Sequence, residues 1–388
     1  MSDEERQLRA RATELAQRYL LTDGHVDLPY RLKILNFQLE REFLPIPIES
    51  EKGDFDYKRA VAGGLDAPFM SIYIPSRYQE TGGAKELADS LIDMVTGIAA
   101  AHPKNFRIAK SPDDLRQNFA DGVMSLPMGM ENGAPIEGDL SRIAYFRDRG
   151  ISYVTLTHAK DNLICDSSYD TTATHGGLSD FGRDVVREMN RTGIMVDISH
   201  VSDSTFWQVM EMTDVPCIAS HSSVRYYTPG FDRNMNDAMI KRLGENNGVI
   251  MINFGSTFLD GRLRERQDSL RTALTEELAA AGLEYADEEA KDMVEAFRSR
   301  NPTLYSDVEM VADHIDRVVR ITGSTDHVGF GSDFDGVGDS LPTGLKDVAD
   351  YPNLIYTLLE RGYTEESIEK MCSGNLLRVW DAVVGGSR

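Results

Sequence analysis

Short apolar segments alternate with longer amphipathic segments along most of this chain, and this alternation constrains the fold more than any other feature. The apolar segments have the length of single strands, whereas segments such as residues 84–102 and 179–193 have the spacing of helices. Strands that alternate with helices form parallel β-α-β units. The strand-like segments are residues 21–28, 67–74, 122–130, 152–158, 194–200, 215–222, 248–255 and 327–334.

These eight segments, with no linker rich in Pro, Gly or Ser between them, favour an α/β fold built as a (β/α)8 barrel of the TIM type. An open, doubly wound sheet is the alternative, but no Gly-x-Gly-x-x-Gly pattern follows the first segment. Barrels of this type accommodate more than ~250 residues in one domain. We therefore predict a single barrel domain over residues 1–388.

Two further segments lie outside the strand pattern. Residues 1–20 have helical spacing, and we expect them to form an N-terminal helix packed on the outside of the barrel. Residues 260–306 hold two charged helical stretches and no strand pattern, which predicts a helical insertion between strands 7 and 8. This insertion is compatible with a lid, an oligomer contact or simple decoration.

The bulk composition excludes several classes of partner. The formal net charge of -22 argues against binding to nucleic acid or to an anionic membrane surface. Cys165, Cys217 and Cys372 are far apart and form no Cys-x-x-Cys pair, so we expect free thiols in a reducing compartment. The first 20 residues are charged throughout, and no window approaches the ~18 apolar residues of a membrane span. We therefore expect a cytoplasmic protein.

Metal-binding types of side chain stand at the carboxyl ends of the strand segments. His25 and Asp27 are two residues apart, so in a strand they point to the same face. Alone, such a pair is equally compatible with a solvated strand end. However, four of the eight histidines stand at strand ends, which meet at one rim of a barrel, where active sites lie. The residues at these ends are His25, Asp27, Glu131, His158, His200, His221 and Asp333.

Five of these side chains form a set of imidazole and carboxylate ligands without sulfur. Such a set suits zinc and also manganese or cobalt. Five ligands exceed what one four-coordinate site needs, and a carboxylate that bridges two ions accounts for the surplus. Glu131 is the natural bridge, so we predict two divalent metal ions that share a hydroxide. The predicted ligands are His25, Asp27, Glu131, His200 and His221.

With these residues assembled, the chain resembles the renal (membrane) dipeptidase family of zinc peptidases, within the amidohydrolase-like barrels. The resemblance runs from about residue 20 to 380 and indicates a soluble member of the bacterial type. It is carried by the motifs DGHVDLPY, GGLDAPFMSIYIP, GMENG, GISYVTLTH, DISHVSD, ASHSSVR, DRNMND and GFGSDFDGV. GMENG and FMSIY depart from the commoner family patterns, which leaves the side-chain specificity open.

The resemblance implies how the ligands divide between the two zinc ions. The first zinc ion would be bound by His25, Asp27 and Glu131. Glu131 would also bind the second ion, together with His200 and His221. The relatives further imply a homodimer.

The resemblance also implies roles in substrate binding and catalysis. His158 would face the substrate carbonyl and its oxyanion, and Arg233 would pair with the substrate carboxylate. Asp333 would shuttle the proton from the attacking water to the departing amine, and Tyr73 would line the substrate pocket. The implied reaction is the hydrolysis of dipeptides, L-D dipeptides included, by a hydroxide that bridges the two metal ions.

Other functions remain open at this point. The same metals could support deacylation of N-acyl amino acids, lactam hydrolysis or phosphotriester hydrolysis. Phosphotriesterase-like sites use a carboxylated lysine as the bridge, and Lys160 lies close enough in sequence to be considered. A barrel that has lost catalysis and serves as a binding module is a further alternative. Such a protein would usually lack one or more ligands, whereas all five are present here.

Overall fold

Eight parallel strands form one curved sheet in the computed structural model, which describes residues 2–34 and 47–387. Neighbours in the sheet follow one another along the chain, as in a (β/α)8 barrel. The fold class predicted from the sequence is therefore confirmed. In sheet order the strands are β1 (Thr22–Val26), β2 (Ala67–Tyr73), β5 (Met128–Glu131), β6 (Ile151–Thr155), β7 (Met195–Asp197), β8 (Ile218–Ser222), β9 (Val249–Ile252) and β10 (Val328–Phe330).

The sheet closes where the chain beyond β10 meets β1. Val26 forms a parallel bridge with Phe334, and the Asp27 backbone N–H donates a hydrogen bond to the Phe334 carbonyl oxygen over 2.8 Å. The Asp333 N–H donates in the same way to the His25 carbonyl oxygen, over 3.1 Å. These contacts exclude the open, doubly wound sheet.

The predicted strand at residues 122–130 is in fact two strands. Pro127 separates β4 (Met124–Leu126) from β5, since proline has no N–H to donate to a neighbouring strand. Strand β4 pairs with β3 (Phe106–Ile108) in a separate two-stranded parallel sheet. Each of the other seven predicted segments contains one strand of the barrel.

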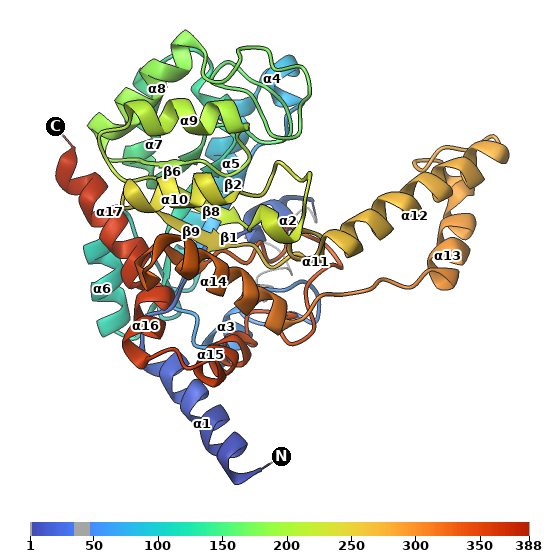
Figure 1. Ribbon diagram of the computed structural model, residues 1–388. Coiled ribbons are helices and arrows are strands. Elements are labelled where there is room, and N and C mark those ends of the chain that lie inside the picture. Colours follow the sequence, from blue (N-terminus) through green and yellow to red (C-terminus); the bar gives the residue numbers. More distant parts are fainter. Residues whose placement is uncertain (1, 35–46, 388) are drawn as a thin grey trace.

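Helices surround the barrel (Figure 1), and α8 illustrates how the sequence sets their ends. Ser179 caps the first turn by accepting a hydrogen bond from the Gly182 N–H, and Gly193 ends the helix with a φ of 78°. Among the described helices, none is both long and apolar enough to cross a bilayer. The helices are α1 (Asp3–Arg18), α2 (Leu28–Ile34), α3 (Tyr57–Gly63), α4 (Tyr78–Thr81), α5 (Ala84–Ala101), α6 (Pro112–Ala120), α7 (Ser141–Arg149), α8 (Asp180–Thr192), α9 (Asp203–Met212), α10 (Asp237–Glu245), α11 (Ser256–Leu259), α12 (Gly261–Ala280), α13 (Lys291–Arg300), α14 (Val308–Thr322), α15 (Tyr351–Glu360), α16 (Glu365–Glu369) and α17 (Asn375–Gly386).

Helices α12 and α13 form an arm, residues 261–300, which projects away from the barrel between β9 and β10 (Figure 1). The arm has a small apolar cluster of its own, centred on Leu278, Ala290 and Val294. The chain returns to its starting point, because the Ser306 N–H donates a hydrogen bond to the Ser256 hydroxyl over 2.9 Å. The division into one domain with a terminal helix and an insertion stays a prediction.

Candidate metal centre

The five predicted metal ligands come together at the carboxyl ends of the strands. His25 lies within β1 and Asp27 follows it, Glu131 ends β5, His221 lies within β8, and His200 follows β7. All five side chains are buried or nearly so. Parallel strands therefore bring residues nearly 200 positions apart in the sequence to one rim.

Glu131 lies at the centre of this group. Its Oε2 atom is 3.5 Å from His25 Nε2, whereas its Oε1 atom is 3.0 Å from His200 Nε2 and 3.3 Å from His221 Nε2. The two carboxylate oxygens thus face different histidines. This is the arrangement that a carboxylate bridging two cations requires.

Two further residues with predicted catalytic roles also lie within the group. His158 Nε2 is 3.6 Å from Glu131 Oε1, and Asp333 lies with His25 and Asp27 around a third possible ion position. The ligand atoms within each possible set lie within 4.8 Å of one another. The sets are His25, Glu131 and His221; Glu131, His158 and His200; and His25, Asp27 and Asp333.

A tyrosine on β6, which does not pair with β1, determines which ring nitrogen of a neutral His25 carries the proton. The Tyr153 hydroxyl donates its single proton to the Gly24 carbonyl oxygen over 2.9 Å, and it lies 2.9 Å from His25 Nδ1. It must therefore accept a hydrogen bond from Nδ1–H. In the neutral form of His25 the lone pair is therefore on Nε2, and no described residue forms a hydrogen bond with this atom. Such a nitrogen is free to bind a metal.

A serine performs the same task for His221. The Ser220 hydroxyl donates to Asp197 Oδ2 over 2.6 Å and lies 2.8 Å from His221 Nδ1. It therefore accepts from Nδ1–H, which again leaves the lone pair on Nε2. Asp197 also accepts from the backbone N–H groups of Ser199 and Ser220, so its position is firmly fixed.

The charge distribution of this group fits divalent cations. Burial, and then the nearby positive charge of Arg233, lowers the pKa of His200 well below its usual value. Burial, and then the charge of His25, lowers the pKa of His221 in the same direction. Their Nε2 atoms lie 2.9 Å apart and both face the Glu131 carboxylate. Neutral imidazoles with lone pairs directed at a buried carboxylate need a cation between them.

The backbone around Asp333 is unusual. Asp333 has a φ of 64° and His200 a φ of 69°, values that are uncommon outside glycine and that cluster at functional sites. Asp333 Oδ2 accepts a hydrogen bond from the Asn253 side-chain amide over 2.7 Å. Burial, and then the negative charge of Asp27, raises the pKa of Asp333 to about 8. A carboxyl group of this kind holds a proton near neutral pH.

A glycine allows the two aspartates to approach each other. A Cβ atom on Gly336 would lie 2.1 Å from Asp27 Oδ2 and 2.2 Å from Asp333 Oδ1, so no side chain fits there. The backbone of the loop after β10 therefore packs directly against both carboxylates.

Arg233 lies behind the metal group and is almost fully buried. Its guanidinium donates to the Ser222 hydroxyl and to the His221 carbonyl oxygen, each over 2.7 Å, while Nε has no partner among the described residues. Its predicted pairing with a substrate carboxylate stays a prediction. Lys160 is exposed, with its Nζ atom 3.8 Å from Glu80, whereas Glu131 lies at the centre of the ligand group, so Glu131 is the better candidate for the bridge.

A cavity of about 700 Å³, the metal cavity, opens over this group. Tyr73, at the end of β2, forms part of its wall and contacts the rings of His158 and Tyr30 edge-on, at centroid distances of 4.8 and 4.9 Å. The volume is in the range of sites for small ligands. Other wall residues are Ile34, Ala159, Tyr169, Thr257, Phe258, Gln267, Val337 and Ser340.

The comparison with known families agrees with this geometry. A profile of the membrane dipeptidase family, Peptidase family M19, matches residues 9–386. The chain belongs to this family. Two relatives are each 32% identical to it: an uncharacterised dipeptidase of Schizosaccharomyces pombe and the dipeptidase tcpJ of Claviceps purpurea. The matches cover 93% and 92% of this chain, and 80% and 75% of the relatives.

The fold is shared with solved structures. The crystal structure of the probable dipeptidase PvdM from Pseudomonas aeruginosa superposes with a TM-score of 0.80 at 24% identity, over 98% of this chain and 100% of that chain. At this sequence identity, the structural similarity supports the barrel fold of the chain.

Sequence reasoning missed the residues that support the metal ligands. Tyr153 lies in an apolar strand and reads as an ordinary core residue, and Asp197 reads as part of another buried strand. The only local signal was for Ser220, a hydroxyl directly beside a histidine in Ser-His-Ser. Asn253, which holds Asp333, gave no signal at all.

Proposed function

We propose that this member of the membrane dipeptidase family hydrolyses dipeptides with two divalent metal ions, zinc being the resident metal. The proposal rests chiefly on Glu131, whose two oxygens face His25 on one side and His200 with His221 on the other. Two relatives at 32% identity are named dipeptidases. The nitrogen and oxygen ligands without sulfur are those of catalytic zinc sites.

We divide the five predicted ligands between two ions as the family resemblance implies. His25, Asp27 and Glu131 would hold one ion, and Glu131, His200 and His221 the other. When bound, the two cations lower the pKa of a shared water, so that hydroxide is available at neutral pH. Tyr153 and Ser220 keep the histidine lone pairs directed at the ions.

Residues on the cavity wall would carry out the remaining steps. His158 faces the cavity near Glu131 and would stabilise the negative charge that develops on the scissile carbonyl oxygen. Asp333 lines the same cavity, with one oxygen held by Asn253, and would pass a proton to the departing amine. Tyr73 would exclude water from the bound peptide.

Arg233 would limit the substrate to two residues. A guanidinium that binds the terminal carboxylate next to the scissile bond leaves no room for a longer chain. Its unpartnered Nε and its closeness to His221 support this assignment. L-D dipeptides are included in the proposal, while the homodimer and the cytoplasmic location stay predictions.

A substrate panel with one variant tests the proposed function. Zinc-loaded protein is expected to hydrolyse L-Ala-L-Ala and L-Ala-D-Ala, and to leave N-acetyl-L-alanine, a lactam and a phosphotriester largely intact. Asp333→Asn is expected to lower kcat on the order of 100- to 10,000-fold with the metal content unchanged. Asp292→Asn, an exposed carboxylate on the arm, is the matched control. Near-normal turnover by Asp333→Asn would refute the proton transfer, and preference for the acylated substrate would replace dipeptidase with deacylase.

A further inference from the structure

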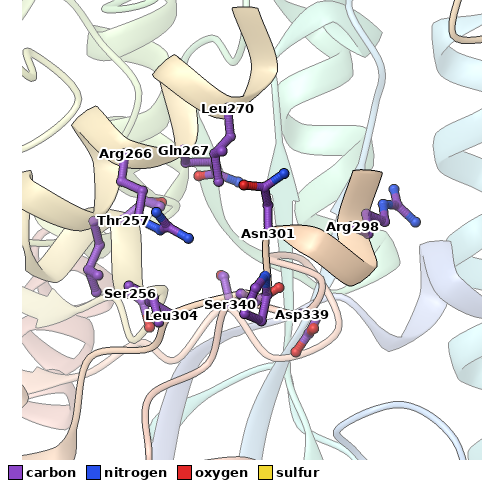
Figure 2. A pocket seen from close by; sticks show the side chains of 13 residues that line it. Ser256, Thr257, Arg266, Gln267, Leu270, Arg298, Asn301, Leu304, Asp339 and Ser340 are labelled. Carbon is purple, nitrogen blue, oxygen red and sulfur yellow. The ribbon is translucent and has the colours of Figure 1, made fainter. Parts of the chain in front are cut away.

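A second cavity of about 620 Å³ adjoins the metal cavity. It lies between α12, the end of α13 and the loops after β9 and β10 (Figure 2), and we call it the arm cavity. Thr257, Gln267 and Ser340 line both cavities. The two cavities therefore share part of their walls, and a ligand bound over the metal group could extend from one into the other.

Arg266 is the charged side chain that extends into the arm cavity in Figure 2. It is half-buried, and it has no hydrogen bond or carboxylate partner among the described residues. Three other arginines in the arm have carboxylate partners: Arg262 with Asp260 at 2.6 Å, Arg264 with Asp268 at 3.9 Å and Arg300 with Glu277 at 2.9 Å. Arg271 has none among the described residues, but it is exposed and lies outside the cavity lining.

The other two charged groups in the lining of the arm cavity each form a hydrogen bond with a tyrosine hydroxyl. Arg298 points away from the other labelled side chains in Figure 2 and donates to the Tyr285 hydroxyl over 2.6 Å. Asp339 accepts a hydrogen bond from the Tyr305 hydroxyl over 2.7 Å. Because the whole chain carries a net charge of -22, a guanidinium in a cavity with no carboxylate partner among the described residues is a distinct local feature. Planar guanidinium groups bind carboxylates through two parallel hydrogen bonds.

We propose that the arm cavity is a subsite for an acidic side chain of the substrate, an inference that rests on the proposed dipeptidase function. The scissile bond would lie over the metal group, while a side chain ending in a carboxylate would pass Gln267 and Ser340 and pair with Arg266. The amide groups of Gln267 and Asn301, which both line the cavity, supply further hydrogen bonds to the carboxylate. The arm thereby selects acidic dipeptides.

A series of dipeptides of increasing side-chain length tests this assignment. Each dipeptide contains L-alanine and, at either position, aspartate, glutamate, 2-aminoadipate or 2-aminosuberate, and each acid is compared with its neutral side-chain amide. At the best length, the zinc-loaded enzyme is expected to favour the acid over the amide in kcat/KM by on the order of 10-fold or more. In Arg266→Ala this ratio falls to about one, whereas it is retained in Arg271→Ala, an exposed arginine of the same helix outside the cavity lining.

Binding of the same acid and amide to the full-length Asp333→Asn variant, measured by calorimetry, provides a readout that needs no turnover. An acid preference that disappears when Arg266→Ala is added supports the subsite even if the hydrolysed bond differs from the one proposed. Equal binding of acid and amide at every length, or a preference that survives Arg266→Ala, overturns it. Failure of the dipeptidase function itself would show separately, as absence of L-Ala-L-Ala hydrolysis by the zinc-loaded wild-type enzyme.

Discussion

The barrel mouth and the arm support their polar side chains in opposite ways. At the mouth, His25 and His221 are fully buried, and the second nitrogen of each is held by a hydroxyl that is itself fixed. In the arm, the helices are mostly exposed and the apolar cluster around Leu278 is small. The position of each polar side chain at the mouth is therefore fixed by several other residues. Most polar side chains of the arm contact solvent and at most one neighbouring side chain.

This difference separates two properties of the enzyme. Substitutions at the mouth should affect metal binding, turnover and folding together, because one hydrogen-bond network serves all three. Substitutions in the arm should change substrate preference or local stability and leave the barrel intact. The following predictions test that separation, beginning with the largest expected effect.

Glu131→Gln should have the largest effect, because an amide supplies one neutral oxygen where the carboxylate supplies two negative ones. Dipeptide turnover should fall on the order of 1,000-fold or more, equivalent to about 4 kcal/mol of transition-state stabilisation. Elemental analysis should find fewer than two bound ions per chain. Glu276→Gln, an exposed position in the arm, should change neither quantity. Full metal occupancy in Glu131→Gln would contradict its role as the bridge.

His314 joins the mouth to the base of the arm and should make stability depend on pH. Its Nδ1 accepts from the Val224 N–H over 2.9 Å, and its Nε2 lies 3.0 Å from the Leu259 carbonyl oxygen. Burial lowers the pKa of His314 to about 4. In the unfolded chain His314 takes up a proton near the ordinary histidine pKa of ~6.5, whereas in the folded chain it stays neutral down to pH ~4. The contribution of neutral His314 to the free energy of unfolding is therefore complete above pH ~6.5 and is lost as the pH falls towards ~4.

Between pH ~6.5 and pH ~4, the contribution of His314 to the free energy of unfolding falls by about 3 kcal/mol. Urea unfolding with chelator present should show that the stability difference between wild type and His314→Gln shrinks by about this amount as the pH falls. His175→Gln, at an exposed loop position, should show no such change. A difference that is constant with pH would mean that His314 is not held neutral.

Tyr153→Phe tests the support of a ligand without removing the ligand. The ring packing against Phe69 is retained, but His25 Nδ1–H loses its acceptor, so metal affinity should fall about 10- to 100-fold. Competition with a chromophoric chelator measures this. Tyr363→Phe removes a hydroxyl that donates to Asp316 elsewhere and should leave the affinity unchanged. Equal affinities in the two variants would show that the hydroxyl does not orient His25.

A leucine-to-alanine substitution in the arm should have the smallest effect of all on global stability, and the same substitution in the main core should have a much larger one. Leu278→Ala should loosen α12 and α13 locally, which hydrogen exchange would detect, and the free energy of barrel unfolding should change by less than about 0.5 kcal/mol. Leu243→Ala, in the main core on α10, should lower that free energy by about 2–5 kcal/mol. Similar global losses would mean that the arm and the barrel unfold as one unit.

The strands and the metal ligands could be predicted from the sequence because both follow simple local rules. Each barrel strand is a short apolar segment, and the i, i+2 spacing of His25 and Asp27 directs both side chains to one face. The closure of the barrel then determines where the strand ends meet. These rules require no knowledge of side-chain packing.

The supporting residues could not be predicted, because their roles depend on contacts between strands. Tyr153 acts on His25 from a strand more than 100 positions away, and nothing in its own segment indicates this. Asp197 and Asn253 are comparable cases. The true extent of α12, which starts at Gly261 and not at the charged stretch itself, likewise depends on the cap that Asp260 provides by accepting from the Arg262 N–H.

The hydrogen bond between Ser306 and Ser256 has a consequence for how such enzymes diversify. Since the chain leaves and re-enters the barrel at adjacent points, residues 257–305 between the two serines form a segment that can be exchanged as a unit. Replacing this segment between the two serines should change which peptides the enzyme prefers, while the barrel and the residues at its mouth stay the same.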